Sequence, residues 1–178
     1  MLPVLAIMRW TMGLPIFCFW KNAPGFRLSV PICFVTLNST RLFQPYFNVR
    51  VRDMNVLFIG ILTEEVIAGT KNEKEIGTFI DVDEAAKEAG IICGNYRTVD
   101  TDLTILLTHI GLEEDRRLAE RLHPDWGVNI IGGHSHSYME QPEIVNGIPI
   151  VQAFTGTDQI GRFDIRYDTD RDEIVSWA

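Results

Sequence analysis

Val128-Asn129-Ile130-Ile131-Gly132-Gly133-His134-Ser135-His136 is the stretch with the clearest fold signal in the chain. Its first four residues form a mostly apolar run that is typical of a buried strand. The two glycines after the run let the backbone turn sharply and approach a ligand closely. In extended backbone, side chains two residues apart point the same way, so His134 and His136 can face one site. Because α/β proteins keep their chemistry where strands end, the pattern predicts a metal-capable site at this position.

A second histidine stands in the same kind of place. Leu103 to Leu107 is predicted to be a strand buried on both faces, and His109 follows it before a helix from about Leu112 to Leu122. The intervening helix makes the two strands parallel neighbours, so their C-terminal ends lie side by side. We therefore expect His109 to meet His134 and His136.

Each histidine also has a simpler interpretation. A single histidine after a strand is more often a surface or core residue than a ligand. The joint context of His109, His134 and His136 favours metal binding, and imidazole suits zinc, manganese, iron, cobalt or nickel, so the metal stays open. His123 precedes Pro124, where a cap or dipole contact at a helix C-terminus explains it, and it is left out of the predicted site.

The segment from Val99 to Tyr167 resembles the second half of the calcineurin-like metallophosphoesterase domain of the 5'-nucleotidases, a group that includes UDP-sugar hydrolases and cyclic-nucleotide phosphodiesterases. The matching segments follow one another in order: Leu107-Thr108-His109-Ile110-Gly111, Ile130 to His136, Val145 to Ala153, and Ile160 to Ile165. Further upstream, Leu42 to Tyr46 and Val56 to Thr63 look like the family's segment leading into a central strand. The resemblance covers about Arg41 to Trp177.

The resemblance implies an α/β fold, as part of a layered α/β/β/α sandwich that is incomplete at its N-terminus. It implies that His109 and His134 bind one ion of a two-metal pair and that His136 binds the other. It also implies a nucleotide or other phosphoester as substrate. Proteins of this family are often exported, but the compartment of this chain is undetermined because no convincing signal peptide is present.

Three motifs that complete the family's metal site are absent from the printed sequence: Asp-x-His, Gly-Asp-x-x-x-Asp, and Gly-Asn-His-Glu or Gly-Asn-His-Asp. In two-metal sites the ions lie about 3.5–4 Å apart and clamp the attacking and leaving oxygens, with a bridging carboxylate between them. No catalytic residue can be assigned here, and the substrate-binding residues are unknown. Two function classes stay open: an incomplete or inactive phosphoester hydrolase, and a non-catalytic single-metal-binding remnant or product of a disrupted gene.

The composition divides the chain near residue 40. Residues 1–52 contain no Asp or Glu and six Lys or Arg, whereas residues 53–178 contain all 24 acidic residues. Residues 1–40 form an atypical apolar segment without helical or strand periodicity, and four prolines interrupt it. Residues 41–178 are assigned to the partial metallophosphoesterase domain. We expect the first 40 residues to pack poorly and to contribute no functional group.

A reading-frame shift explains the first segment as well as an unrelated apolar leader does. Residues 5–13 can be back-translated so that a shifted frame encodes Gly-Asn-His-Glu-Met-Asp-Tyr-Gly, which contains the family's missing third motif. Several codons are free in this exercise. Met and Trp have single codons, however, so the Asp and the final Gly are forced. Both interpretations stay open on the sequence alone.

Charge and cysteine content narrow the function classes. A net charge of −8 argues against binding to nucleic acid, and the acidic run Glu113-Glu114-Asp115 is most simply solvated surface. Three widely spaced cysteines give no disulfide framework, and Cys93 is expected to pack on its helix. No spanning helix is expected, because no uninterrupted apolar run reaches about 20 residues. The oligomeric state cannot be predicted.

The remaining pattern predicts ordinary α/β elements. A strand is expected over Asn55 to Leu62, and a helix from the Asp81 cap towards Asn95, with five small or apolar residues on its buried face. Glu64 to Thr78 is predicted to be a charged loop. Further strands are expected over Ile148 to Phe154, over Gly161 to Tyr167, and at the end of the chain near Trp177.

Overall fold

The structure is a computed structural model that describes residues 34–35, 40–41, 46–51, 54–62, 81–97, 101–155, 161–168, 170–171 and 173–177. In chain order its elements are β1 Phe34–Val35, β2 Thr40–Arg41, β3 Tyr46–Val51, β4 Met54–Ile61, α4 Val82–Arg97, β5 Leu103–Thr108, α5 Leu112–Arg121, the 3₁₀ turn η1 Pro124–Trp126, β6 Val128–Ile131, β7 Glu143–Val145, β8 Ile148–Val151, β9 Ile165–Asp168 and β10 Glu173–Trp177. Most of the apolar segment 1–40, including the shifted-frame motif, and the predicted loop from Glu64 to Thr78 lie outside the described residues.

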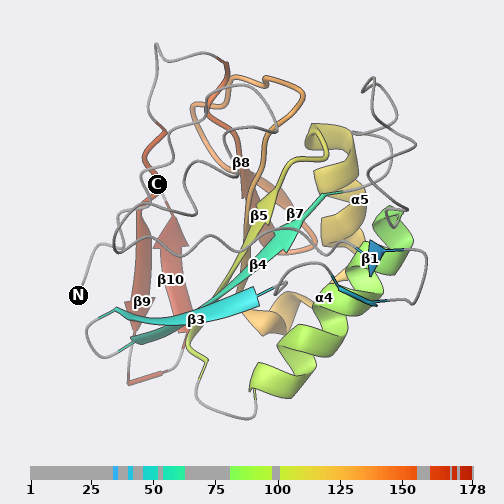
Figure 1. Ribbon diagram of the computed structural model, residues 1–178. Helices are drawn as coiled ribbons and strands as arrows, with labels where there is room; N and C mark the ends of the chain where they lie inside the picture. Colours follow the sequence, from blue (N-terminus) through green and yellow to red (C-terminus); the bar gives the residue numbers. More distant parts are fainter. Residues whose placement is uncertain are drawn as a thin grey trace, which may run out of the picture.

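A six-stranded sheet forms the centre of the described fold (Figure 1). Its strand order is β3-β4-β5-β6-β8-β7, in which β4, β5, β6 and β8 are parallel. The outer strands β3 and β7 run antiparallel to their neighbours. The parallel strands are the most apolar and the most buried, as expected for a sheet that is covered on both faces.

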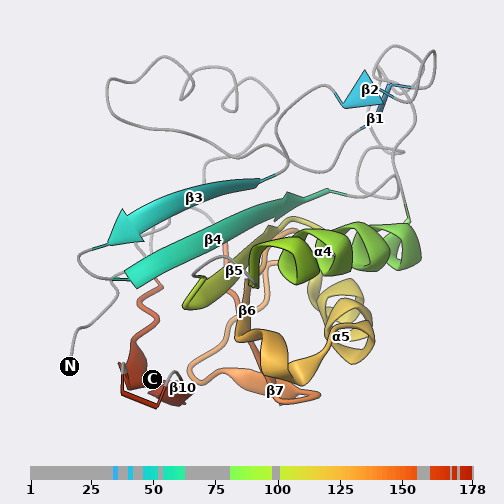
Figure 2. The same ribbon diagram turned by 90° about the horizontal axis from the view of Figure 1, so that it is seen from below.

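Helices α4 and α5 cover one face of this sheet (Figures 1 and 2). The face of α4 predicted to be buried is indeed inside: the exposed fraction is 7% or less for Ala85, Ala86, Ala89, Ile92 and Cys93. Burial raises the pKa of the Cys93 thiol to about 12, so this cysteine packs as a small apolar residue, as predicted. From α5, Leu118, Ala119 and Leu122 join the same core.

The other face of the sheet packs against β9 and β10, which form a separate antiparallel pair. Phe163 and Ile165 lie in a second core with strand residues of the large sheet such as Ile105. Trp177 also donates its indole N–H to the buried side-chain oxygen of Asn129, at 3.0 Å. The described residues therefore form three successive layers, α/β/β, of the predicted α/β/β/α sandwich.

Most elements were predicted at the correct place, but two predicted strands are shorter than expected and two edge strands of the large sheet were not predicted. The strand expected over Gly161 to Tyr167 is confined to β9, and the one expected over Ile148 to Phe154 ends at Val151, beyond which only a single bridge joins Ala153 to Tyr138. The hairpin strand β7 and the edge strand β3 were not predicted. Both are edge strands with partly exposed residues, so they lack the continuous apolar run that marks a buried strand.

Candidate metal site

The order of the sheet brings two histidine-bearing segments together. β5 and β6 are parallel neighbours, with Leu107 opposite Ile131 at their C-terminal ends. His109 follows β5, and the loop that contains His134 follows β6. The centroids of the His109 and His134 rings lie 5.2 Å apart, with the ring planes at 68°. The predicted approach of these two residues is confirmed, and its cause is the predicted parallel pairing.

Gly132 and Gly133 are needed because the chain passes close to other groups here. A Cβ built on Gly133 would lie 3.1 Å from His109 Nδ1, and one built on Gly132 would collide with Asp115 Oδ2. The next residues, His134 and His136, have positive φ angles of 78° and 54°. Such backbone is uncommon for residues other than glycine and is held only where the surroundings fix it.

The pKa of His109 is lowered, first because partial burial of the ring disfavours its charged form and then because His134 and His136 repel a positive charge on it. The lowered pKa keeps the imidazole neutral, which is the form that binds metals. His136 therefore acts on His109 electrostatically, although its own side chain is exposed, as is that of His134.

Imidazole donors from two adjacent strand ends suit a transition-metal ion. Within the described part of the chain, however, no group of three or more His, Cys, Asp or Glu side chains is placed to hold a metal. The described residues bring two imidazoles together, those of His109 and His134, and His136 is close enough to lower the pKa of His109. The assignment of all three as ligands stays a prediction.

Asp115 was predicted to be solvated surface, and this prediction is wrong. Its exposed fraction is 0%, because it lies one helical turn before Leu118 on the face of α5 that meets the sheet. Its carboxylate accepts hydrogen bonds from Thr108 Oγ1, at 2.6 Å, and from Gln152 Nε2, at 3.2 Å. Burial raises its pKa to about 7, although both hydrogen bonds act in the opposite direction.

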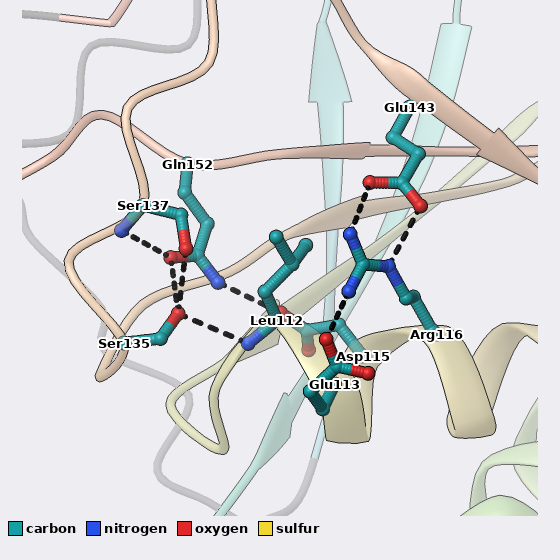
Figure 3. Close-up of polar contacts among 8 residues, drawn as sticks. All are labelled: Leu112, Glu113, Asp115, Arg116, Ser135, Ser137, Glu143 and Gln152. Carbon is teal, nitrogen blue, oxygen red and sulfur yellow. Dashed lines mark hydrogen bonds and ion pairs between the residues drawn. The ribbon is translucent and has the colours of Figure 1, made fainter.

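Gln152 is the second buried polar residue that sequence reasoning missed. Its Nε2 also donates to Gly133 O at 3.3 Å. Its Oε1 accepts from Ser135 Oγ at 3.0 Å and from Ser137 N at 3.3 Å (Figure 3). The one available signal for Asp115 was its spacing of three residues from Leu118 in an otherwise apolar stripe. Gln152 gave no such signal, because its partners come from α5 and from the loop after β6.

His123 lies outside this group, as predicted, but its contact differs from the expected one. Its Nδ1 accepts a hydrogen bond from Asp125 N at 3.3 Å, so it caps the start of η1 and not the end of α5. The reason is that Pro124 stands at the first position of a new 3₁₀ turn, whose free N–H groups need an acceptor.

Proteins that act on phosphoesters have sequences similar to this one. The trifunctional nucleotide phosphoesterase protein YfkN of Bacillus subtilis is 30% identical over 129 residues, which cover 70% of this chain and 8% of that protein. The 5'-nucleotidase of Vibrio parahaemolyticus is 28% identical over 187 residues, which cover 89% of this chain and 32% of that protein. The chain carries part of a calcineurin-like metallophosphoesterase domain of the 5'-nucleotidase type. No protein-family model matches it.

Solved structures show the same metallophosphoesterase fold. The sulfate thiohydrolase SoxB of Thermus thermophilus superposes with a TM-score of 0.68 at 22% identity, over 82% of this chain and 26% of that one. A 5'-nucleotidase precursor, also from Thermus thermophilus, superposes with a TM-score of 0.59 at 25% identity, over 76% and 29%. The chain thus spans about a third or less of the length of these relatives. In the described part, none of the helices is long and apolar enough to cross a membrane.

Proposed function

We propose that this metallophosphoesterase domain serves the hydrolysis of nucleotide phosphoesters and that His109, His134 and His136 are its metal ligands. The observation that carries the proposal is the 5.2 Å approach of the His109 and His134 rings at the ends of two adjacent parallel strands. The relatives add the substrate class, because those with matching sequence include a nucleotide phosphoesterase and a 5'-nucleotidase.

His109 and His134 would hold one divalent ion, and His136 would face the second position. When bound, such ions polarise a phosphoryl oxygen and lower the pKa of a coordinated water. The chain's own residues supply the imidazole donors. The lowered pKa of the partly buried His109 favours its neutral form, and the loop with His134 approaches it closely because Gly133 has no side chain.

We propose that this chain by itself hydrolyses nucleotides at a negligible rate. The three family motifs that complete the metal site, Asp-x-His, Gly-Asp-x-x-x-Asp and Gly-Asn-His-Glu or Gly-Asn-His-Asp, are absent from its sequence. Without a bridging carboxylate the charges of two neighbouring cations are poorly compensated. The alternative, a non-catalytic domain that binds a single metal, draws support from the described residues, which present an imidazole pair without a third metal-binding group placed beside it.

Binding of AMP to the purified protein tests the proposal. Calorimetric titrations are run with Zn²⁺, with Mn²⁺ and without metal, and phosphate release is followed in parallel. We expect AMP binding to require metal, to be lost in His134→Ala, and to be accompanied by phosphate release close to background. Metal-independent AMP binding that His134→Ala leaves unchanged would contradict the proposed site. Rapid metal-dependent turnover would instead show that the chain is catalytically complete.

A further inference from the structure

A chain of hydrogen bonds connects the two segments that carry the histidines. It begins at Thr108, which immediately precedes His109, and passes through Asp115 and Gln152. It ends at Ser135 and Ser137, which flank His136 on the other segment (Figure 3). Thr108, Asp115 and Gln152 are each at most 5% exposed. Bonds in so dry an environment are costly to break, because water cannot replace the lost partner.

The same group of hydrogen-bonded residues also supports the start of α5. Gly111 precedes this helix and provides no side chain to cap it. The N–H of Leu112 donates instead to Ser135 Oγ at 3.0 Å, and the N–H of Gly111 donates to Gly133 O at 3.0 Å. The helix that carries Asp115 is therefore capped by the loop that Asp115 helps to hold.

The strained backbone lies inside this arrangement. His134 and His136, with their positive φ angles, stand on either side of Ser135. Unusual backbone of this kind costs on the order of 1–3 kcal/mol per residue and persists only where neighbouring contacts fix it. Ser135 and Ser137 supply those contacts, and both bond to Gln152 Oε1. The orientation of the Gln152 amide is set by Asp115 together with the carbonyl of Gly133, because both accept from its Nε2.

We infer that Asp115 and Gln152 are positioning residues, which hold the His109 segment and the His134–His136 loop in one fixed relative geometry. The consequence for metal binding rests on the proposed function above, whereas the geometry itself does not. Neither residue is assigned a contact with metal or substrate.

The chemistry of the pair makes the inference testable by a near-isosteric change. In Asp115→Asn residue 115 keeps one acceptor oxygen, so the Thr108 hydroxyl and Gln152 Nε2 can no longer both donate to it. If the new NH₂ group faces Gln152, Gln152 must turn its amide over to restore its bond to residue 115, and it then presents an NH₂ group to the N–H of Ser137. If the NH₂ group faces Thr108, the hydroxyl oxygen accepts from it, but the hydroxyl hydrogen loses its acceptor. In either orientation one of the two donors loses its acceptor, and the amide of Ser137 is the reporter farthest from the substitution.

The experiment uses the full chain without metal and measures two quantities by NMR: hydrogen exchange of the Ser137 amide and the imidazole ¹⁵N shifts of His134 and His136. We expect Asp115→Asn to speed Ser137 exchange by about tenfold, the equivalent of one ordinary hydrogen bond, and to move both ring signals. The double variant Asp115→Asn with Gln152→Glu reverses donor and acceptor, and we expect it to recover part of both effects.

Arg116→Gln is the matched control, because it removes another link between α5 and the sheet. Arg116 bonds both carboxylate oxygens of Glu143 on β7, at 2.7 and 2.8 Å, and this pair does not reach the histidine segments. If Arg116→Gln changes Ser137 exchange and the ring signals as much as Asp115→Asn does, the inference is overturned. No change in Asp115→Asn, or no recovery in the double variant, would also overturn it.

Thr108→Val is a second variant for the case that Asp115→Asn does not fold. It removes one donor to Asp115 and leaves the rest of the chain of bonds in place, and Thr108→Ser restores the hydroxyl. We expect Ser137 exchange to be faster in the Val variant and normal in the Ser variant. Equal exchange in both would contradict the inference. A Zn²⁺ titration of the same proteins keeps the two proposals separate, because failure of the wild type to bind Zn²⁺ refutes the metal site while the NMR results still decide the positioning role.

Discussion

The centroids of the His109 and His134 imidazole rings lie 5.2 Å apart, although the two residues are 25 positions apart in the chain. This proximity follows from one pairing, that of β5 with β6, and from one close passage of backbone, at Gly133. Substitution of Gly133 therefore tests whether the proximity matters.

Gly133→Ala is expected to push His109 away from His134. The added Cβ would stand 3.1 Å from His109 Nδ1, so either the ring or the loop must shift. We expect a loss of about 1–3 kcal/mol in the free energy of unfolding, as for other overpacked sites, and weaker Zn²⁺ binding. Gly94→Ala is the control, because its Cβ would meet nothing within 4 Å and alanine favours the helix. A Gly133→Ala protein with wild-type stability and Zn²⁺ affinity would show that the close approach of Gly133 to His109 is not required.

Stability should depend on pH through Asp115. Its pKa is raised in the folded state to about 7, whereas an unfolded aspartate titrates near its ordinary value of about 3.9. Between these values the folded state binds the additional proton, so its stabilising contribution is complete below about pH 4 and is lost as the pH rises towards about 7. Relative to wild type, Asp115→Asn should thus gain stability across this range, by at most about 1.4 kcal/mol per pH unit. Urea unfolding of both proteins at several pH values measures the difference. A difference that is constant with pH would contradict the assignment.

The second sheet should depend on one buried hydrogen bond. Trp177 Nε1 donates to Asn129 Oδ1 at 3.0 Å, and Asn129 is completely buried on β6. We expect Asn129→Ala to cost about 2–4 kcal/mol, since the change removes buried contacts and leaves the indole N–H without this acceptor. A double-mutant cycle with Trp177→Phe isolates the pair. Strictly additive effects would show that the bond does not attach β10 to the large sheet.

The gene sequence decides between the two interpretations of the first segment. If a frame shift separates residues 1–40 from the rest, the codons for residues 5–13 must encode Gly-Asn-His-Glu in the shifted frame. We then expect a single-base correction to add metal-binding groups and to raise Zn²⁺ affinity. Codons that are incompatible with this motif would remove the frame-shift interpretation and leave the apolar leader.

The sequence predicted the position of those strands and helix faces that are buried along their whole length. Parallel strands such as β5 and the alanine-rich face of α4 show uninterrupted apolar patterns, so their positions and the meeting of His109 with His134 could be predicted. Edge strands such as β3 lack that pattern. Asp115 was misplaced because a charged residue in an acidic run is normally solvated, and only the three-dimensional arrangement reveals that Thr108 and Gln152 bind it. The positive φ angle of His134 likewise depends on bonds between its loop and Gln152, a residue distant in the sequence.

Metal titration of four histidine variants is the sharpest test of the proposed site. Zn²⁺ binding is measured by calorimetry at neutral pH for the wild type and for His109→Ala, His134→Ala, His136→Ala and His123→Ala. We predict that the wild type binds Zn²⁺, that each of the first three variants loses at least about tenfold in affinity, and that His123→Ala, outside the site, retains wild-type affinity. Equal Zn²⁺ affinity in the wild type, His109→Ala and His134→Ala would contradict the metal site.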